Sequence, residues 1–144
     1  MLELDTDGTK QAEHFINAVG EDLSGRLIPA VEVRLRGLYR LLPPDYYEAA
    51  DNLADFCDRI EKQYGVRPVI YCTERTYKNI VASDSRFNKD KIWYESLFSK
   101  PDEDMNWTFW TYTNRVKFSF YESGEYLHMT VFNGSEDDFK KLIL

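Results

Sequence analysis

The 144-residue sequence has few of the features that mark membrane, exported or nucleic-acid-binding proteins. No apolar run approaches the roughly 20 residues that a helix needs to cross a bilayer, and the opening MLELDTDG lacks the basic and apolar regions of a signal peptide. The 18 Lys and Arg residues are outnumbered by 25 Asp and Glu residues, which are spread along the chain and disfavour nucleic acid as a partner. These absences predict a soluble, cytoplasmic protein that binds neither membranes nor nucleic acid.

Spacings of residues that would form a metal site are also lacking. Cys57 and Cys72 lack the Cys or His spacing of a metal site, and we expect them to be buried free thiols. The acidic stretch Asp102–Asp104 lacks the ligand spacing and the glycine of a calcium loop, so a solvated turn accounts for it. The sequence therefore predicts no metal and no cofactor.

Apolar residues, in contrast, are plentiful enough for a core. Hydrophobic residues make up 43% of the chain and aromatic residues 15%, which suits one folded domain of ordinary size. The chain contains no internal repeat, low-complexity stretch or obvious linker. We therefore expect residues 1–144 to form a single domain.

Apolar residues at helical spacing predict four helices. Each has a residue that can cap its first turn: Thr6, Asp7 or Thr9 in the first, Asp45 in the second, Thr73 in the third and Ser135 in the fourth. Glu48 and Asp138 stand where capping boxes would form in the second and fourth helices. Gly20 and Gly65 are predicted to end the first and second.

Strands are predicted between and after these helices. The run Leu27–Val33 is apolar almost throughout, as in a strand covered on both faces, and is interpreted as the central strand, although Pro29 is typical of a strand's beginning or an edge. The other predicted strands are Leu2–Leu4, Val66–Cys72, Lys91–Glu95, Trp107–Tyr112, Val116–Tyr121 and Tyr126–Phe132. An alternation of strands and helices that finishes in several strands indicates an α/β protein with an irregular β/α barrel or part of one.

Several segments, in order, carry a resemblance to a known family. They are Gln11–Ile16, Ile28–Val33, Tyr64–Tyr71, Ile92–Tyr94, Phe109–Tyr112 and Met129–Ser135. Together they span nearly the whole chain, and it resembles the second half of the family-25 glycoside hydrolases, which are lysozyme-type muramidases. The resemblance implies a β/α barrel that cleaves the glycan of bacterial peptidoglycan after N-acetylmuramic acid.

The family's opening strands have no counterpart before Met1, which predicts a partial or rearranged barrel with exposed sheet edges. Two outcomes are open at this point. Copies of the chain could pair as a homo-oligomer that completes the sheet, or the chain could adopt a smaller rearranged α/β fold.

The resemblance also places the family's catalytic carboxylates on altered residues. The family's central strand ends in Asp-x-Glu, whereas this chain has Glu32 at the Asp position and Arg34 at the position of the Glu assigned as the acid. A further acidic residue on the family's last strand corresponds to His128. Glycoside hydrolysis needs one carboxyl group that donates a proton and a second that stabilises the transition state, and a guanidinium, which keeps its proton, cannot donate it at neutral pH.

Aromatic residues at strand ends match the positions where the family presents rings to its sugar substrate. These candidate substrate-binding residues are Tyr71, Trp93, Tyr94, Trp110 and Tyr112. Such rings could hold a glycan without cutting it. Core or rim packing is the alternative interpretation of most of them.

Three hypotheses follow from these observations. The first is a lysozyme-like domain that has lost muramidase activity, with peptidoglycan glycan as its partner and Glu32 and Arg34 joined in a local ion pair. The second is a surviving muramidase in which Glu32 acts with His128 or Glu3 as proton donor. The third is a non-catalytic module that binds cell-wall glycan through its aromatic residues.

Overall fold

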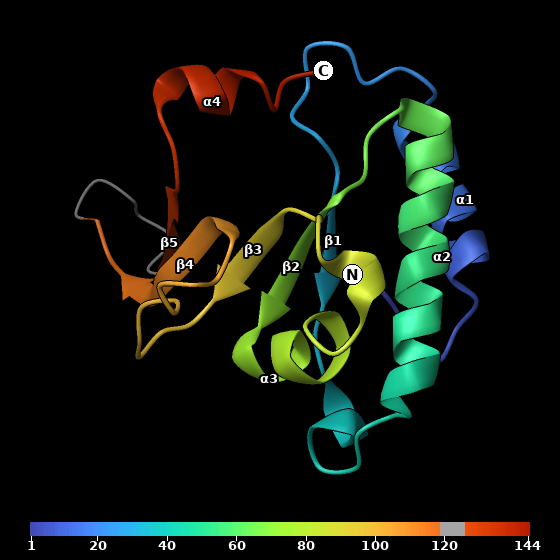
Figure 1. Cartoon of the computed structure of the whole chain (residues 1–144), viewed down its shortest axis with the longest axis horizontal. Helices are drawn as coiled ribbons and strands as arrows, with labels where there is room; N and C mark the ends of the chain where they lie inside the picture. Colours follow the sequence, from blue (N-terminus) through green and yellow to red (C-terminus); the bar gives the residue numbers. More distant parts are fainter. Residues whose placement is uncertain (119–125) are drawn as a thin grey trace.

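The computed structural model, which describes residues 1–118 and 126–144, has one mixed sheet in the order β1-β2-β3-β4-β5 (Figure 1). The strands are β1 Ala30–Val33, β2 Val69–Thr73, β3 Ile92–Glu95, β4 Trp107–Val116 and β5 Leu127–Phe132. The first four are parallel and β5 pairs antiparallel with β4. The carboxyl ends of β1 to β4 therefore meet at the same edge of the sheet.

Two long helices, α1 Gly8–Val19 and α2 Tyr46–Tyr64, lie side by side on one face of this sheet (Figure 1). A Cβ atom added to Gly8 would come within 1.8 Å of the Asn52 carbonyl oxygen, so only glycine permits this approach of the two helices. Asp7 and Asp45 cap the two helices, and Gly65 ends α2 with a φ of +74°. The predicted capping box of the second helix is wrong, because Asp45 accepts a hydrogen bond from the backbone N–H of Tyr47 and not from Glu48.

Shorter elements complete the chain. They are the 3₁₀ helix η1 Gly37–Arg40, the helical turn α3 Glu74–Thr76 with the π-helix η2 Tyr77–Val81, the 3₁₀ helix η3 Ser85–Phe87 and the helix α4 Glu136–Lys140. The capping boxes of α3 and α4 join Thr73 to Thr76 and Ser135 to Asp138. The predicted caps at Thr73 and Ser135 are thus confirmed.

The hydrophobic core lies between the sheet and the helix layer. Alternate residues of β1, β2 and β3 point into it, among them Val33, Ile70 and Ile92, and they meet Leu53 and Ile60 of α2. Both cysteines are buried free thiols in this layer, as the sequence predicts, and burial raises the pKa of the Cys57 thiol to about 12.

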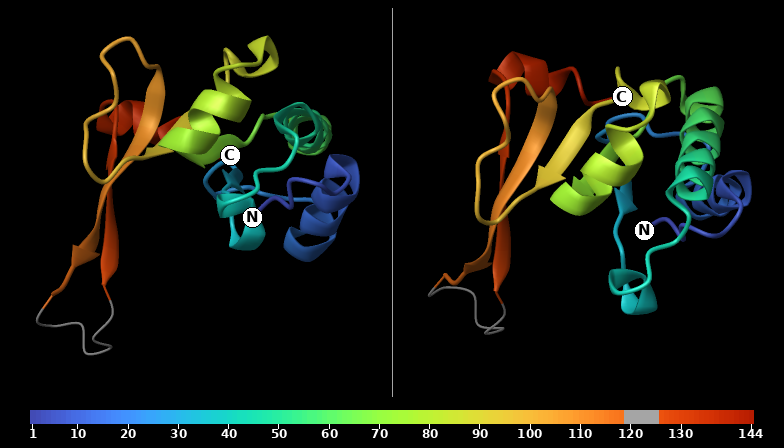
Figure 2. Two further views of the ribbon diagram at one scale, coloured as in Figure 1. Left: turned by 90° about the horizontal axis from the view of Figure 1, so that it is seen from below. Right: turned by 60° about the horizontal axis from the view of Figure 1, so that its bottom comes forward.

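The intervening residues of the strands point to the opposite face of the sheet, where Tyr71 and Trp93 are half-buried, although Val69 and Thr111 are buried. Figure 2 shows β4 and β5 as an arm that stands away from α1 and α2, so the sheet bends and this second face is concave. Only α4, through Phe139, packs onto it among the described elements. The two faces of one sheet therefore have different surroundings.

Three strand predictions need correction. Leu2–Leu4 is not a strand: its one backbone bond to β1, from the Leu2 N–H to the Glu32 carbonyl, is too few for a ladder, although Leu2 and Leu4 are buried. The strand predicted at Leu27–Val33 begins only at Ala30, because Pro29 has no N–H to donate to a ladder. It lies at the edge of the sheet and not at its centre, since no other strand of the described residues pairs with its outer side.

The third correction concerns Trp107–Tyr112 and Val116–Tyr121. One continuous strand, β4, runs to Val116, and Lys117 and Phe118 are not in a strand. The remainder of the second predicted strand lies outside the described residues. A shift in register between Thr111 and Val116 lets β4 and β5 stay paired through this region.

Candidate functional site

A group of charged and aromatic side chains gathers where β1, β2 and β3 end. The parallel register sets Glu32 of β1 beside Tyr71 of β2, and Tyr71 beside Trp93 of β3. Glu95, two residues after Trp93, points to the same face because side chains alternate along a strand. Arg34 follows β1 directly and reaches across this group.

Arg34 joins the group into one network. Its Nε donates to Glu32 Oε1 at 2.7 Å, and its Nη2 donates to Glu95 Oε2 at 2.6 Å and to the Tyr71 hydroxyl at 3.2 Å. The Tyr71 hydroxyl donates in turn to Glu95. A second arginine, Arg36, places its Nη2 3.6 Å from Glu32 Oε1. The predicted ion pair of Glu32 and Arg34 is present. The same guanidinium also binds Glu95, so it holds carboxylates of two different strands together.

The electrostatics of the network keep its proton donors protonated. Burial alone would lower the pKa of Arg34, but the hydrogen bond and charge of Glu95, with the charges of Tyr71 and Glu32, raise it above its ordinary value. Burial, and then the hydrogen bond to Glu95, raise the pKa of Tyr71 well above its ordinary range. Neither group can release a proton to a substrate near neutral pH.

Glu95 is the member of this network that sequence reasoning missed. Its side chain is only 10% exposed, against 24% for Glu32, so it is the more enclosed carboxylate of the two. A signal was available, because the predicted strand Lys91–Glu95 ends in an acid two residues after the candidate Trp93. The same alternation argument that joined Glu32 to Arg34 would have found it.

A row of aromatic rings continues from this network across the concave face. Ring centroids are 5.1 Å apart between Tyr71 and Trp93, 5.1 Å between Trp93 and Phe109, and 5.4 Å between Phe109 and Phe132. Phe139 of α4 closes the row, with 5.3 Å to Phe132. We call these five residues the aromatic row; Phe109, Phe132 and Phe139 were not predicted as site residues.

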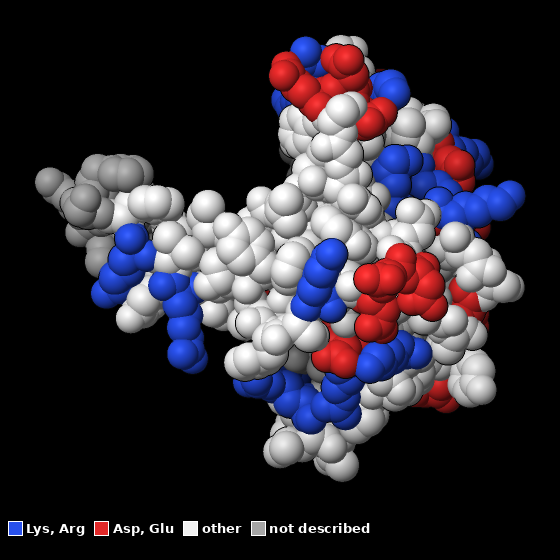
Figure 3. Space-filling model, turned by 60° about the vertical axis from the view of Figure 1, so that its left-hand side comes forward, with Lys and Arg blue, Asp and Glu red and all other residues white. Residues whose placement is uncertain are grey.

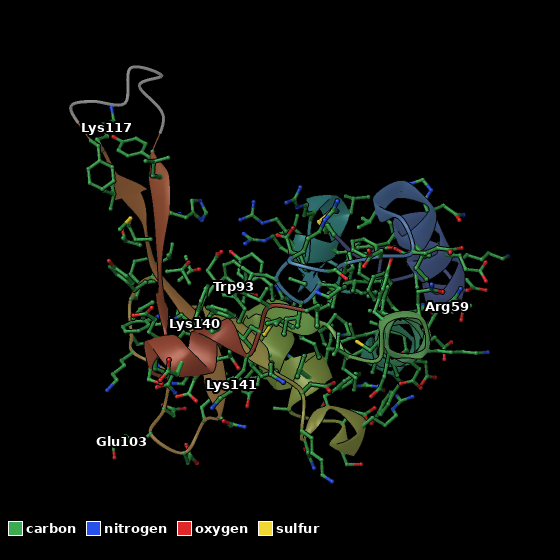
Figure 4. All side chains as sticks on the ribbon, turned by 90° about the horizontal axis from the view of Figure 1, so that it is seen from above. Arg59, Trp93, Glu103, Lys117, Lys140 and Lys141 are labelled. Carbon is green, nitrogen blue, oxygen red and sulfur yellow. The ribbon has the colours of Figure 1, made fainter. Side chains whose placement is uncertain are left out.

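Trp93 occupies the middle of this face. Figure 4 shows it near the centre of the molecule, between the helix layer that carries Arg59 and the arm that carries Lys117. Its indole Nε1–H donates to the Thr111 hydroxyl at 2.9 Å, which holds the ring in one orientation. Its own hydrogen-bonding group is therefore already used.

The structure does not bring Tyr94, Trp110 and Tyr112 to the aromatic row. Tyr94 is 7% exposed and packs edge-on against Tyr77 in the core, and burial raises its pKa to about 12. Trp110 donates from Nε1 to the Ser96 carbonyl and stacks on Tyr112. Strand alternation is the physical reason, since these residues alternate with Trp93 along β3 and with Phe109 along β4 and so point to the opposite face of the sheet.

His128 does not reach the network either. It lies on β5, at the opposite edge of the sheet from β1, with three strands between them. Its side chain is exposed on the β4–β5 arm. No residue of the network contacts it in the part of the chain that the structure describes.

Metal binding has no support in the described residues, where no three His, Cys, Asp or Glu side chains gather as metal ligands. Within residues 1–118 and 126–144, no helix is both long enough and apolar enough to span a bilayer.

Comparison with solved structures reveals close relatives of this fold. The structure is similar to that of a family 25 glycosyl hydrolase from Bacillus anthracis, with a TM-score of 0.84 and 29% identity over 99% of this chain and 65% of that one. A GH25 lysozyme from Aspergillus fumigatus gives a TM-score of 0.73 at 18% identity, over 96% of this chain and 67% of that one. The bacterial lysozyme of Streptomyces coelicolor gives 0.71 at 24%, over 96% and 66%.

This chain thus spans about two thirds of the length of these structures, and its α/β fold is that of part of the family-25 lysozyme domain, as the sequence predicts. A search of curated proteins finds no significant match. The model of the glycosyl hydrolases family 25, however, matches residues 2–119, most of the chain. Together with the shared fold, this match establishes that the chain belongs to glycosyl hydrolase family 25.

Proposed function

We propose that this chain is a lysozyme-like domain that does not cleave peptidoglycan by the two-carboxylate chemistry of glycosidases. The observation that carries the proposal is the position of Arg34, whose guanidinium bonds to both Glu32 and Glu95. Its family membership supports peptidoglycan glycan as the material it contacts. The cleavage chemistry itself needs a carboxyl group free to give up a proton.

The hydrogen bonds that the two glutamates accept from Arg34 support this proposal. Charge-assisted hydrogen bonds from one guanidinium occupy both carboxylates, so neither is free to serve as the general acid toward a substrate. Glu95 also accepts from Tyr71, so two donors surround it. Freeing either glutamate would require breaking a part-buried ion pair with Arg34.

A peptidoglycan turbidity and reducing-end assay tests the proposal directly. The unmodified chain is expected to show no release of reducing ends above buffer. The double variant Glu32→Asp with Arg34→Glu restores the two carboxyl groups, and Arg26→Glu, a charge-matched change at an exposed residue outside the network, serves as control. Hydrolysis by the unmodified chain would overturn the proposal and favour the surviving muramidase, with Glu32 acting alongside an unconventional donor such as His128 or Glu3.

The aromatic row favours a second function, binding of cell-wall glycan without cleavage. Sugar rings pack their apolar faces on aromatic side chains, and the row presents half-buried rings in one line across the concave face. Trp93 lies within the row, whereas Trp110 lies on the other side of the sheet. The two tryptophans therefore form a matched pair for mutation.

Retention on insoluble peptidoglycan would test this second function. Trp93→Ala is expected to reduce retention and Trp110→Ala to leave it unchanged, once thermal unfolding has shown both variants to be folded. Equal retention of the two variants would rule out the aromatic row as the binding surface.

Light scattering on the same samples would test the homo-oligomer, which stays a prediction. A clean monomer would contradict pairing between copies of the chain.

A further inference from the structure

A hollow of about 930 Å³ opens beside the carboxyl ends of β1 and β2. Its lining includes Arg34 and Arg36, which follow β1, Arg40 of η1 and Arg75 of α3, together with Thr73 and Glu95. We call it the arginine hollow. Figure 3 shows Lys and Arg side chains gathered at the lower end of the molecule, the end at which η1 lies in Figure 1.

The charge of the arginine hollow is opposite to that of the chain. Four guanidinium groups and one carboxylate, that of Glu95, line the hollow, and a second carboxylate, Glu32, pairs with Arg34 and Arg36 from outside this lining. The sequence as a whole carries a net charge of −7. Composition therefore does not account for this cluster, whose unbalanced positive charge raises the local concentration of anions.

The rim of the hollow is held in place by a contact between two of its arginines. Arg75 Nη1 donates to the backbone carbonyl of Arg40 at 2.9 Å, which ties η1 to α3. Gly37 has a φ of +55°, a conformation that other residues rarely adopt, and it turns the chain into η1. Arg75 keeps four further N–H donors for a ligand, and no carboxylate pairs with it or with Arg40 at salt-bridge distance among the described residues.

We propose that the arginine hollow binds an acidic saccharide, a sugar that carries carboxylate or phosphate groups. Guanidinium groups pair with such anions through two parallel hydrogen bonds, and Arg40 and Arg75 stand at the rim to make them. The Thr73 hydroxyl and the Glu95 carboxylate can meet sugar hydroxyl groups below. A volume of about 930 Å³ lies within the range of small-molecule sites.

That the ligand is a saccharide rests on the proposed function, since the hollow adjoins the Arg34 network. That the ligand is an anion rests on the arginines alone. Isothermal titration calorimetry at low salt separates the two. The probes are trigalacturonate, which carries carboxylates, fructose 1,6-bisphosphate, which carries phosphates, and maltotriose, which is neutral. At least one acidic probe is expected to bind about tenfold more tightly than maltotriose and to weaken as salt is added.

Variants locate the binding to the hollow. Arg40→Gln and Arg75→Gln are each expected to weaken the acidic probe by about tenfold, while Arg26→Gln, an exposed arginine before β1, leaves it unchanged. Equal binding of maltotriose, an equal loss in the Arg26 variant, or no binding of either acidic probe by the folded protein would overturn the proposal. Peptidoglycan hydrolysis by the unmodified chain would overturn the proposed function alone and leave this titration result standing.

Discussion

The two faces of the sheet differ in what holds them. The face toward α1 and α2 is built from aliphatic residues with almost no exposure, such as Val33, Ile70 and Ile92. The concave face carries an ion-pair network and a row of half-buried rings. Close packing of apolar side chains stabilises the first face, whereas the second retains polar groups whose arrangement suits binding.

A substitution in the aliphatic face toward the helices should have the largest effect. Ile70 is fully buried toward the helices, so Ile70→Ala leaves a cavity and is expected to lower the free energy of unfolding by about 2–5 kcal/mol. Urea unfolding followed by circular dichroism measures the change. Leu38→Ala, at a residue that is 75% exposed, should stay within about 0.5 kcal/mol; a similar loss in both variants would contradict the assignment of the core.

The helix-side layer also contains an ion pair whose loss should be large. Arg67 Nε donates to Asp90 Oδ1 at 2.7 Å, and the Asp90 side chain is only 2% exposed. Arg67→Met leaves that carboxylate unpaired, with an expected cost of about 2 kcal/mol because Arg67 itself is partly exposed. Lys78→Met, which breaks an exposed pair with Glu74, should leave the free energy of unfolding unchanged in the same denaturation experiment, because solvent screens exposed ion pairs.

On the concave face, removing one hydroxyl should have a smaller effect. Tyr71→Phe keeps the ring beside Trp93 and deletes the donor to Glu95, so a loss of about 1 kcal/mol is expected. Tyr47→Phe, at a residue that is 87% exposed, provides the control for loss of a tyrosine hydroxyl. A Tyr71 variant as stable as the unmodified chain would show that the Arg34 network does not depend on this hydroxyl.

The smallest effect is confined to alkaline pH. Burial, with the charge of Glu74, raises the pKa of Tyr94 to about 12, above the ordinary value near 10 that it has when unfolded. The unfolded chain therefore loses this proton first, so the stability that Tyr94 contributes is full below about pH 10 and is lost as the pH rises toward 12. Tyr94→Phe should flatten this part of a stability–pH profile; an unchanged slope would contradict the assignment.

Much of the secondary structure was predictable because it depends on local chemistry. Asp7, Thr73 and Ser135 cap helices as expected, and Gly65 ends α2, since these residues satisfy or relax the helix ends where they stand. Glu32 and Arg34 were predicted to pair because they lie two residues apart. Phe109 was missed because its approach to Trp93 depends on a strand that is distant in sequence. Alternation could have placed Glu95 on the face of Trp93, but its pairing with Arg34 again depends on distant strands.

The sequence by itself therefore determined the four predicted helices and the family resemblance, which depend on residue type and spacing, and it carries the prediction that Arg34 stands where the family has an acid. Only the tertiary structure decided that Arg34 holds Glu95 as well as Glu32, that Tyr94 and Trp110 lie away from the aromatic row, and that four arginines meet around one hollow. The physical reason is strand pairing. It chooses which distant residues become neighbours, and alternation along each strand then sends their side chains to one face or the other.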